Sequence, residues 1–187
     1  MSTIGRRDLA LLLIGAGANG SLDDSLGGLT RLQKYLYLLE EEENVKPVGD
    51  GFEFVAYKAG PYSARLYDDL EFLENLGLIQ SEVVGESSDA EVDEVEKLSF
   101  EELMGDDAAT ADAYEERRFR LTAEGLEHIK KLVESSEYAP IIDGIRRVKS
   151  KYGRYSLNDL LYYVYTKYPK MAIESDIREK VLGRGKR

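Results

Sequence analysis

Two groups of side chains in this sequence have the types and spacing needed to bind a charged ligand. The first group surrounds a Gly-Pro dipeptide at the start of an amphipathic segment and comprises Lys58, Tyr62, Ser63 and Arg65. The second is a cluster of cations interleaved with tyrosines, and its cations are Arg146, Arg147, Lys149, Lys151 and Arg154. Cations neutralise phosphates, and the first residues of a recognition helix face base edges. Both groups are therefore candidate DNA contacts.

A different role is open for each group. Pro61 and Ser63 could serve only to turn the chain and cap a helix, and the helix that follows carries Asp68, Glu71 and Glu74, which would repel phosphates. The cations near residue 150 could form an ordinary solvated helix face. Tyrosine and arginine are also typical of protein interfaces, so a protein partner remains an alternative to DNA.

Catalytic and metal-binding chemistry has few candidate residues. The sequence has no cysteine and a single histidine, His128, so thiolate sites, polyhistidine sites and Ser-His-Asp or Cys-His arrangements find no support. Acidic pairs such as Asp68-Asp69 lie on segments that we expect to be exposed, which disfavours general acid–base catalysis. We therefore expect no enzyme, no catalytic residue, no metal and no cofactor.

The segment Gly15-Ala-Gly-Ala-Asn-Gly20 fits the G-x-G-x-x-G pattern of phosphate-binding loops. That chemistry needs a strand before the loop and a helix opening directly on it. Here the next residues lead into further glycines, and no βαβ unit follows. We do not expect a nucleotide at this segment.

Charge is distributed very unevenly along the chain. The net charge is −11, yet residues 138–187 hold 12 Lys/Arg against 5 Asp/Glu. Residues 82–116 hold 14 acidic residues against one lysine. The overall field would repel nucleic acid, whereas the basic end could still hold it.

The longest apolar run, 9–18, is too short to span a bilayer. Arg6-Arg7 before it and Ala16-Gly17-Ala18 at its end have the form of a secretory signal, but Asp8 at the start of the run weakens that interpretation. We expect instead a first helix over 6–16, no membrane association and a cytoplasmic location, with which the lack of cysteine agrees.

The periodicity of apolar residues predicts a mainly α fold with a small β-sheet, in the α+β class. We expect helices at 6–16, 30–43, 63–76, after Thr122, around 141–148, at 156–168 and at 174–182, with strands at 52–58, 78–84 and 117–121. Thr30, Ser63, Thr122 and Ser156 are the expected N-caps. The last two strands would form a wing hairpin around an acidic insert at about 85–116, which holds one short helix at 99–104.

Three motifs together resemble a known group of proteins. They are Arg31-Leu-Gln-Lys-Tyr-Leu-Tyr-Leu-Leu39, then Phe54-x-x-Tyr57-x-x-Gly60-Pro-Tyr-Ser63, then Leu73-x-x-x-Gly77-Leu-Ile79. This pattern resembles prokaryotic YwgA-like proteins and, more distantly, the Panacea (SocA-like) antitoxin domain. The resemblance covers about residues 29–79. It implies a winged-helix-like domain that binds DNA or neutralises a partner protein, without catalytic residues.

We therefore predict a winged-helix-like domain at 1–135, with a basic, tyrosine-rich helical extension at 138–187. The expected function is that of a prokaryotic nucleic-acid-binding protein, such as a transcriptional regulator. The alternative is a protein-interaction module, either antitoxin-like or a subunit of a phage-defence complex. The Leu and Tyr content of the last helices also suggests a homodimer.

Overall fold

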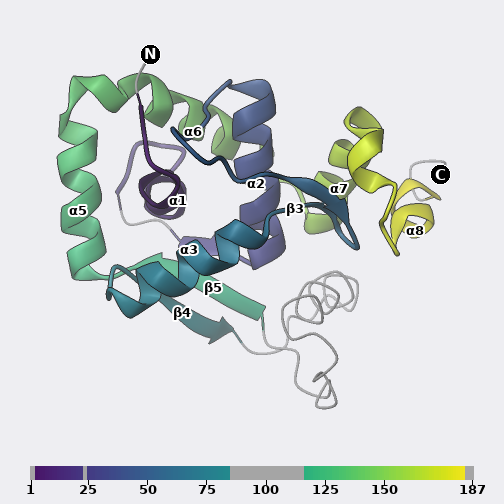
Figure 1. Cartoon of the computed structure of the whole chain (residues 1–187), viewed down its shortest axis with the longest axis horizontal. Coiled ribbons are helices and arrows are strands. Elements are labelled where there is room, and N and C mark those ends of the chain that lie inside the picture. Colours follow the sequence, from purple (N-terminus) through teal and green to yellow (C-terminus); the bar gives the residue numbers. More distant parts are fainter. Residues whose placement is uncertain (1–2, 23–24, 85–115, 184–187) are drawn as a thin grey trace.

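The computed structural model describes residues 3–22, 25–84 and 116–183 (Figure 1). The helices in these ranges are α1 Arg6–Gly15, α2 Leu29–Glu42, α3 Ala64–Asn75, α5 Ala123–Glu134, α6 Ala139–Tyr152, α7 Leu157–Lys167 and α8 Arg178–Gly183, with 3₁₀ turns η2 Ser136–Tyr138 and η3 Pro169–Ala172. The strands are β1 Ser25–Gly27, β2 Val55–Tyr57, β3 Gly60–Tyr62, β4 Ile79–Val84 and β5 Glu116–Leu121. The acidic insert predicted at 85–116 and its helix at 99–104 lie outside the described residues, apart from the first residue of β5.

The predicted class is confirmed, since helices dominate and the sheets are small and antiparallel. The strands predicted on either side of the insert pair as expected, with Ile79 opposite Leu121. A third strand was not foreseen. β1, where the sequence predicted no strand, pairs with β5 with Leu26 opposite Phe119 and gives the order β1-β5-β4.

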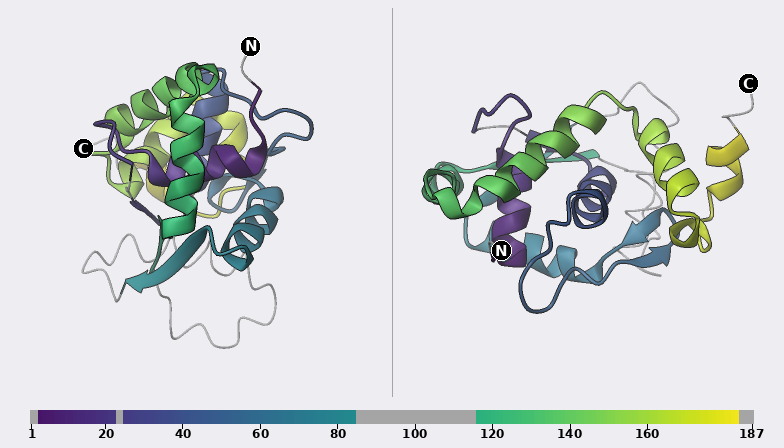
Figure 2. Two further views of the ribbon diagram at one scale, coloured as in Figure 1. Left: turned by 90° about the vertical axis from the view of Figure 1, so that its left-hand side faces the viewer. Right: turned by 90° about the horizontal axis from the view of Figure 1, so that it is seen from above.

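Helix α1 is the centre of the core. Every residue from Leu9 to Gly15 is buried, because α1 packs against helices α2, α3, α5 and α6 and against β5 (Figures 1 and 2). One continuous apolar cluster extends from α1 through α2 into α6, α7 and α8, where it includes Ile145, Leu160 and Val181. The apolar core therefore crosses the boundary predicted between 135 and 138.

Local capping follows the sequence at most helix starts. The hydroxyls of Ser63, Thr122 and Ser156 each accept a hydrogen bond from a backbone N–H in the first turn, which confirms these N-caps. The prediction for Thr30 is wrong, because α2 already begins at Leu29 and Gly28 occupies the cap position. The last helix also starts later than predicted, after the 3₁₀ turn η3.

The Gly-Pro dipeptide does not form the predicted turn. Gly60 and Pro61 belong to β3, which pairs with β2 in a hairpin whose turn is Lys58–Ala59. Proline suits this position because a two-stranded ribbon leaves one edge of each strand unpaired.

Helix α2 holds this hairpin through polar side chains. The backbone N–H of Ser63 donates to Gln33 Oε1 at 2.8 Å, and Lys34 Nζ donates to the carbonyl oxygen of Pro61 at 3.1 Å. Gln33 and Lys34 are both buried. These bonds satisfy backbone groups that a two-stranded hairpin leaves open, so the Gln-Lys pair and the Gly-Pro-Tyr-Ser segment form one structural unit.

No helix in the described ranges is long and apolar enough to cross a membrane.

Candidate functional site

The cations predicted on α6 are mostly engaged with residues of this chain. Arg147 pairs with Glu43 at 2.7 Å, Lys151 with Glu42 at 2.9 Å, and Arg146 with Asp143 at 3.4 Å. Lys149 is buried and donates to the carbonyl oxygen of Ile14 at 3.3 Å. Arg154 is exposed at the end of the helix. Pairing with carboxylates reduces the positive field that α6 presents to a polyanion.

The predicted residues near α3 are similarly engaged. The side chain of Ser63 is fully buried, because its hydroxyl donates to the carbonyl oxygen of Phe52 while capping α3. Arg65 forms ion pairs with Asp50 at 3.4 Å and Glu53 at 2.7 Å.

Neither Tyr62 nor Lys58 stands alone on an open surface. The ring of Tyr62 lies between those of Tyr57 and Tyr67, with centroids 4.9 and 5.5 Å away. Lys58 is half-buried in the hairpin turn, and its carbonyl oxygen accepts a hydrogen bond from the N–H of Asp176.

The structure does not bring the two predicted groups together. Helices α3 and α6 lie on opposite sides of α1 and α2 (Figures 1 and 2). The exposed side chains of α3 include Asp68, Glu71 and Glu74, as the sequence suggested. The nine predicted residues therefore do not form one basic surface, and Ser63 and Lys149 are too buried to contact a duplex.

The most heavily bonded carboxylate is Glu42, at the end of α2. It accepts hydrogen bonds from the hydroxyls of Tyr152, Tyr163 and Tyr168 and from the amines of Lys151 and Lys167. Burial acts to raise the pKa of Glu42, but the bonds from Lys167, Tyr152, Tyr163 and Lys151 outweigh it and lower the pKa to about 2. A carboxylate so fully bonded ties α2 to α6 and α7, and it is unsuited to proton transfer near neutral pH.

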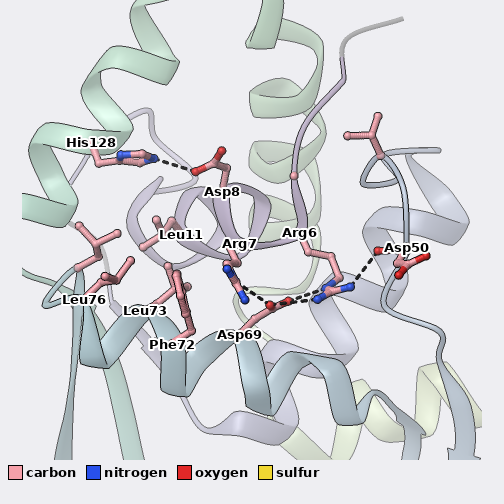
Figure 3. Close-up of a pocket in the computed structure, with 13 residues that line it drawn as sticks. Arg6, Arg7, Asp8, Leu11, Asp50, Asp69, Phe72, Leu73, Leu76 and His128 are labelled. Atoms are coloured by element: carbon pink, nitrogen blue, oxygen red, sulfur yellow. Dashed lines mark hydrogen bonds and ion pairs between the residues drawn. The ribbon is translucent and has the colours of Figure 1, made fainter.

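A groove of about 490 Å³ opens between α1, α3 and α5 (Figure 3). We call it the α1–α3 groove. Its lining is Gly5, Arg6, Arg7, Asp8, Leu11, Val48, Asp50, Asp69, Phe72, Leu73, Leu76, Leu78 and His128. This volume lies within the range of sites that hold small ligands or single side chains of a partner.

The base of the groove is a buried ion cluster around Asp69. Its carboxylate is 0% exposed and accepts from Arg6 Nε at 2.6 Å, Arg6 Nη2 at 3.1 Å and Arg7 Nε at 3.0 Å. The hydrogen bond to Asp69 raises the pKa of Arg6 despite partial burial. The sequence-based expectation that the Asp68-Asp69 pair is exposed is therefore wrong for Asp69, which faces α1.

The walls of the groove are apolar and partly exposed. The Arg7 guanidinium lies over the Phe72 ring, 3.5 Å from its centroid. Phe72 is 39% exposed, Leu76 57% and Val48 49%. Phe72 and Leu76 lie at the C-terminal end of α3, beside the buried Leu73, which lines the same groove. This amphipathic helix therefore has more apolar surface than the core covers.

His128 on α5 reaches the rim of the groove and contacts Asp8, with Nε2 and Oδ1 2.7 Å apart. No pattern in the sequence signals this pair, because the two residues are 120 positions apart and meet only when α5 packs on α1. No sequence pattern signals the Arg6–Asp69 pair either, since its residues are 63 positions apart and meet only when α3 packs on α1.

No protein-family model matches this sequence, and no curated protein matches it significantly. The resemblance of residues 29–79 to YwgA-like and Panacea proteins therefore stays a prediction.

The α1–α3 groove combines apolar walls with an arginine that the buried Asp69 holds in place. Within the described ranges, no group of three or more His, Asp or Glu side chains is placed to hold a metal ion. The residues that line the groove include no serine and no threonine beside the His128–Asp8 pair.

Proposed function

We propose that this protein is a non-catalytic protein-interaction module that uses the α1–α3 groove as its binding surface. One observation carries the proposal. Among the described residues, six large apolar side chains are notably exposed, and three of them, Val48, Phe72 and Leu76, line this one groove. Exposed apolar residues scattered singly need no explanation, but a cluster with a concave floor is typical of a binding site.

The composition of the groove supports a protein partner. Interface centres are enriched in aromatic residues and arginine, and the groove places Arg7 directly on Phe72. Because Asp69 already orients Arg7, little side-chain entropy would be lost when a partner binds.

Electrostatics also favour protein over DNA. The chain carries a net charge of −11, the exposed face of α3 is acidic, and Arg65, Arg147 and Lys151 are paired with carboxylates. Duplex binding depends on several cations that release counterions from phosphates. Cations that already neutralise carboxylates contribute less to this release.

The proposal is tested by recovering and rebinding a partner. The tagged chain is isolated from its native cells, and any copurifying protein is expressed alone and titrated back by calorimetry. We expect saturable binding that is lost in a Phe72→Ser/Leu76→Ser variant. Binding should be kept in a Val55→Ser/Ile173→Ser variant, because Val55 and Ile173 are, as a pair, at least as exposed but lie outside the groove. Equal binding by both variants would contradict the proposal.

Nucleic-acid binding is the second candidate, favoured by the order of elements. The succession is α1-β1-α2-β2-β3-α3-β4-β5, closed by an antiparallel β4–β5 hairpin. Apart from the β2–β3 hairpin between α2 and α3, it matches the order expected of a winged-helix domain. A second depression, of about 630 Å³ at α7, is lined by Tyr155, Asp159, Tyr162, Tyr163, Thr166 and Lys167. Tyrosines beside a cation suit base stacking.

Fluorescence anisotropy with duplex and single-stranded DNA, titrated across salt, separates the two candidates. The protein-interaction proposal predicts no binding even at low salt. Binding that weakens steeply with salt and is lost in an Arg147→Ala/Arg154→Ala variant would favour the nucleic-acid candidate instead. Light scattering on the purified chain shows whether a second copy is itself the partner.

A further inference from the structure

We infer that the α1–α3 groove recognises the C-terminal residue of a partner chain, with the terminal carboxylate on Arg7 and an apolar last side chain on Phe72 and Leu76. This inference rests on the proposed function, because it names the chemistry of the partner at the same groove. Three features of the groove carry it: the unused donors of Arg7, the apolar surface beside them, and their separation (Figure 3).

Arg7 has hydrogen-bond donors that no described residue uses. Its Nε is committed to the buried Asp69 at 3.0 Å, whereas within the described ranges its two terminal nitrogens have no hydrogen-bond partner. The side chain is 47% exposed. A guanidinium held through Nε presents its Nη1 and Nη2 hydrogens as a parallel pair, which matches the two oxygens of a carboxylate.

Arg6 differs from its neighbour in this respect. Its Nε and Nη2 both bind Asp69, and its Nη1 donates to the carbonyl oxygen of Asp50 at 3.0 Å. The negative charge of the Asp69 carboxylate is thus neutralised by Arg6. Arg7 places a second positive charge beside the same buried carboxylate. Asp8 on the rim faces His128 at 2.7 Å. The groove lining as a whole is not basic, since Asp8, Asp50 and Asp69 stand against Arg6 and Arg7. What favours a carboxylate at Arg7 is the pair of terminal N–H groups that Asp69 leaves unbonded.

The short distance between Arg7 and the apolar side chains favours a C-terminal carboxylate over a side-chain carboxylate. The Arg7 guanidinium carbon lies only 3.5 Å from the centre of the Phe72 ring, and Leu76 follows one turn later on the same helix. A C-terminal residue carries its carboxylate and its side chain on one carbon, so both can be placed within so short a distance. An acidic residue inside a chain carries its carboxylate at the end of its own side chain and needs a second residue to fill the apolar part.

The inference is tested by amide NMR titration with N-acetyl-leucine and, as a matched probe without the charge, N-acetyl-leucinamide. We expect the acid to bind in the millimolar range with shifts at Arg7, Leu11 and Phe72, and the amide to bind about tenfold more weakly. Arg7→Gln should remove the preference for the acid, whereas Arg154→Gln, which changes an exposed arginine outside the groove, should leave it intact.

The outcomes separate this inference from the proposed function. Equal binding of acid and amide, or shifts confined to other surfaces, overturns the C-terminal inference. If the recovered partner then still loses binding to Phe72→Ser/Leu76→Ser, the protein-interaction function stands without it. Two further probes identify the source of the carboxylate: a partner peptide ending in a free carboxylate should bind, and the same peptide with an amidated end should not. Tighter binding of an amidated peptide with an internal glutamate would overturn the C-terminal assignment.

Discussion

Lys34 Nζ donates to the carbonyl oxygen of Pro61 at 3.1 Å, beneath the β2–β3 hairpin. The bond joins two motifs that lie 27 positions apart in the sequence, and both partners are buried. It explains in physical terms why a Gln-Lys pair on a helix and a Gly-Pro segment occur together in this chain. In this chain the two motifs build the β2–β3 hairpin and the start of α3 together.

Gln33→Ala should destabilise the fold by about 1–3 kcal/mol, because it leaves the buried N–H of Ser63 without an acceptor. Urea denaturation followed by circular dichroism measures the change. Gln80→Ala, at an exposed glutamine in β4, is the matched control and should stay within about 0.5 kcal/mol of the wild type. Equal effects of the two variants would contradict the role given to Gln33.

Gly60→Ala should cost more stability than Gly49→Ala. Both glycines have positive φ, at 93° and 74°, so alanine is strained at either position by about 1 kcal/mol. Only at Gly60 would the new methyl group also meet a neighbour, since its carbon would lie 2.8 Å from the Tyr165 ring, whereas Gly49 faces open space. The difference in melting temperature between the variants isolates this clash, and no difference would argue against it.

Glu42 should make stability depend on pH in the acid range. Its folded-state pKa of about 2 lies below the ordinary value of 4.5, so its stabilisation is fully present above pH 4.5 and is lost as pH falls through 2. Because Lys151 and Lys167 are about half exposed, solvent screens these pairs, and we expect about 2 kcal/mol in total.

Glu42→Gln should therefore lower stability at pH 7 and flatten the curve between pH 4.5 and 2. Glu41→Gln, at the exposed neighbouring residue, should leave the wild-type pH profile in place. Denaturation midpoints across this pH range check both variants. A Glu42→Gln variant with an unchanged acid profile would show that the carboxylate does not hold α2 to α6 and α7.

Asp69→Ala should destabilise the protein by about 2–4 kcal/mol, since it leaves the partly buried Arg6 without its carboxylate. Asp68→Ala is the matched control, because Asp68 is exposed and adjacent on the same helix. Thermal melts of the two variants should differ by several degrees. Similar melts would mean that the ion cluster contributes little to the fold.

Local patterns in the sequence predicted much of the fold. Apolar periodicity located the helices, and Ser63, Thr122 and Ser156 marked their starts because capping depends only on residues three positions away. The paired strands β4 and β5 were also foreseen. The turn predicted at Gly60-Pro61 was wrong because this dipeptide suits both a turn and an edge strand. Its place in β3 is supported by a hydrogen bond from Lys34, which lies 27 positions away in the sequence.

The candidate site was largely beyond prediction. A carboxylate such as Asp69 looks like any exposed acidic residue until α1 packs over it and brings Arg6 and Arg7 within 3.0 Å. The predicted cations had the opposite outcome. They were recognised by type, but their pairing with Glu42 and Glu43 depends on the packing of α6 against α2, which no local pattern encodes.

Site-specific photocrosslinking in the native cells tests the central claim most directly. A photoreactive benzoylphenylalanine takes the place of Phe72 in the groove or, as a control, of Val55 in β2, which is more exposed than Phe72. The proposed function predicts a discrete crosslinked product from position 72 that protease digests and nuclease does not, with none from position 55. The absence of a product at position 72, equal products from both positions, or a nuclease-sensitive product would contradict the claim that the α1–α3 groove binds a protein.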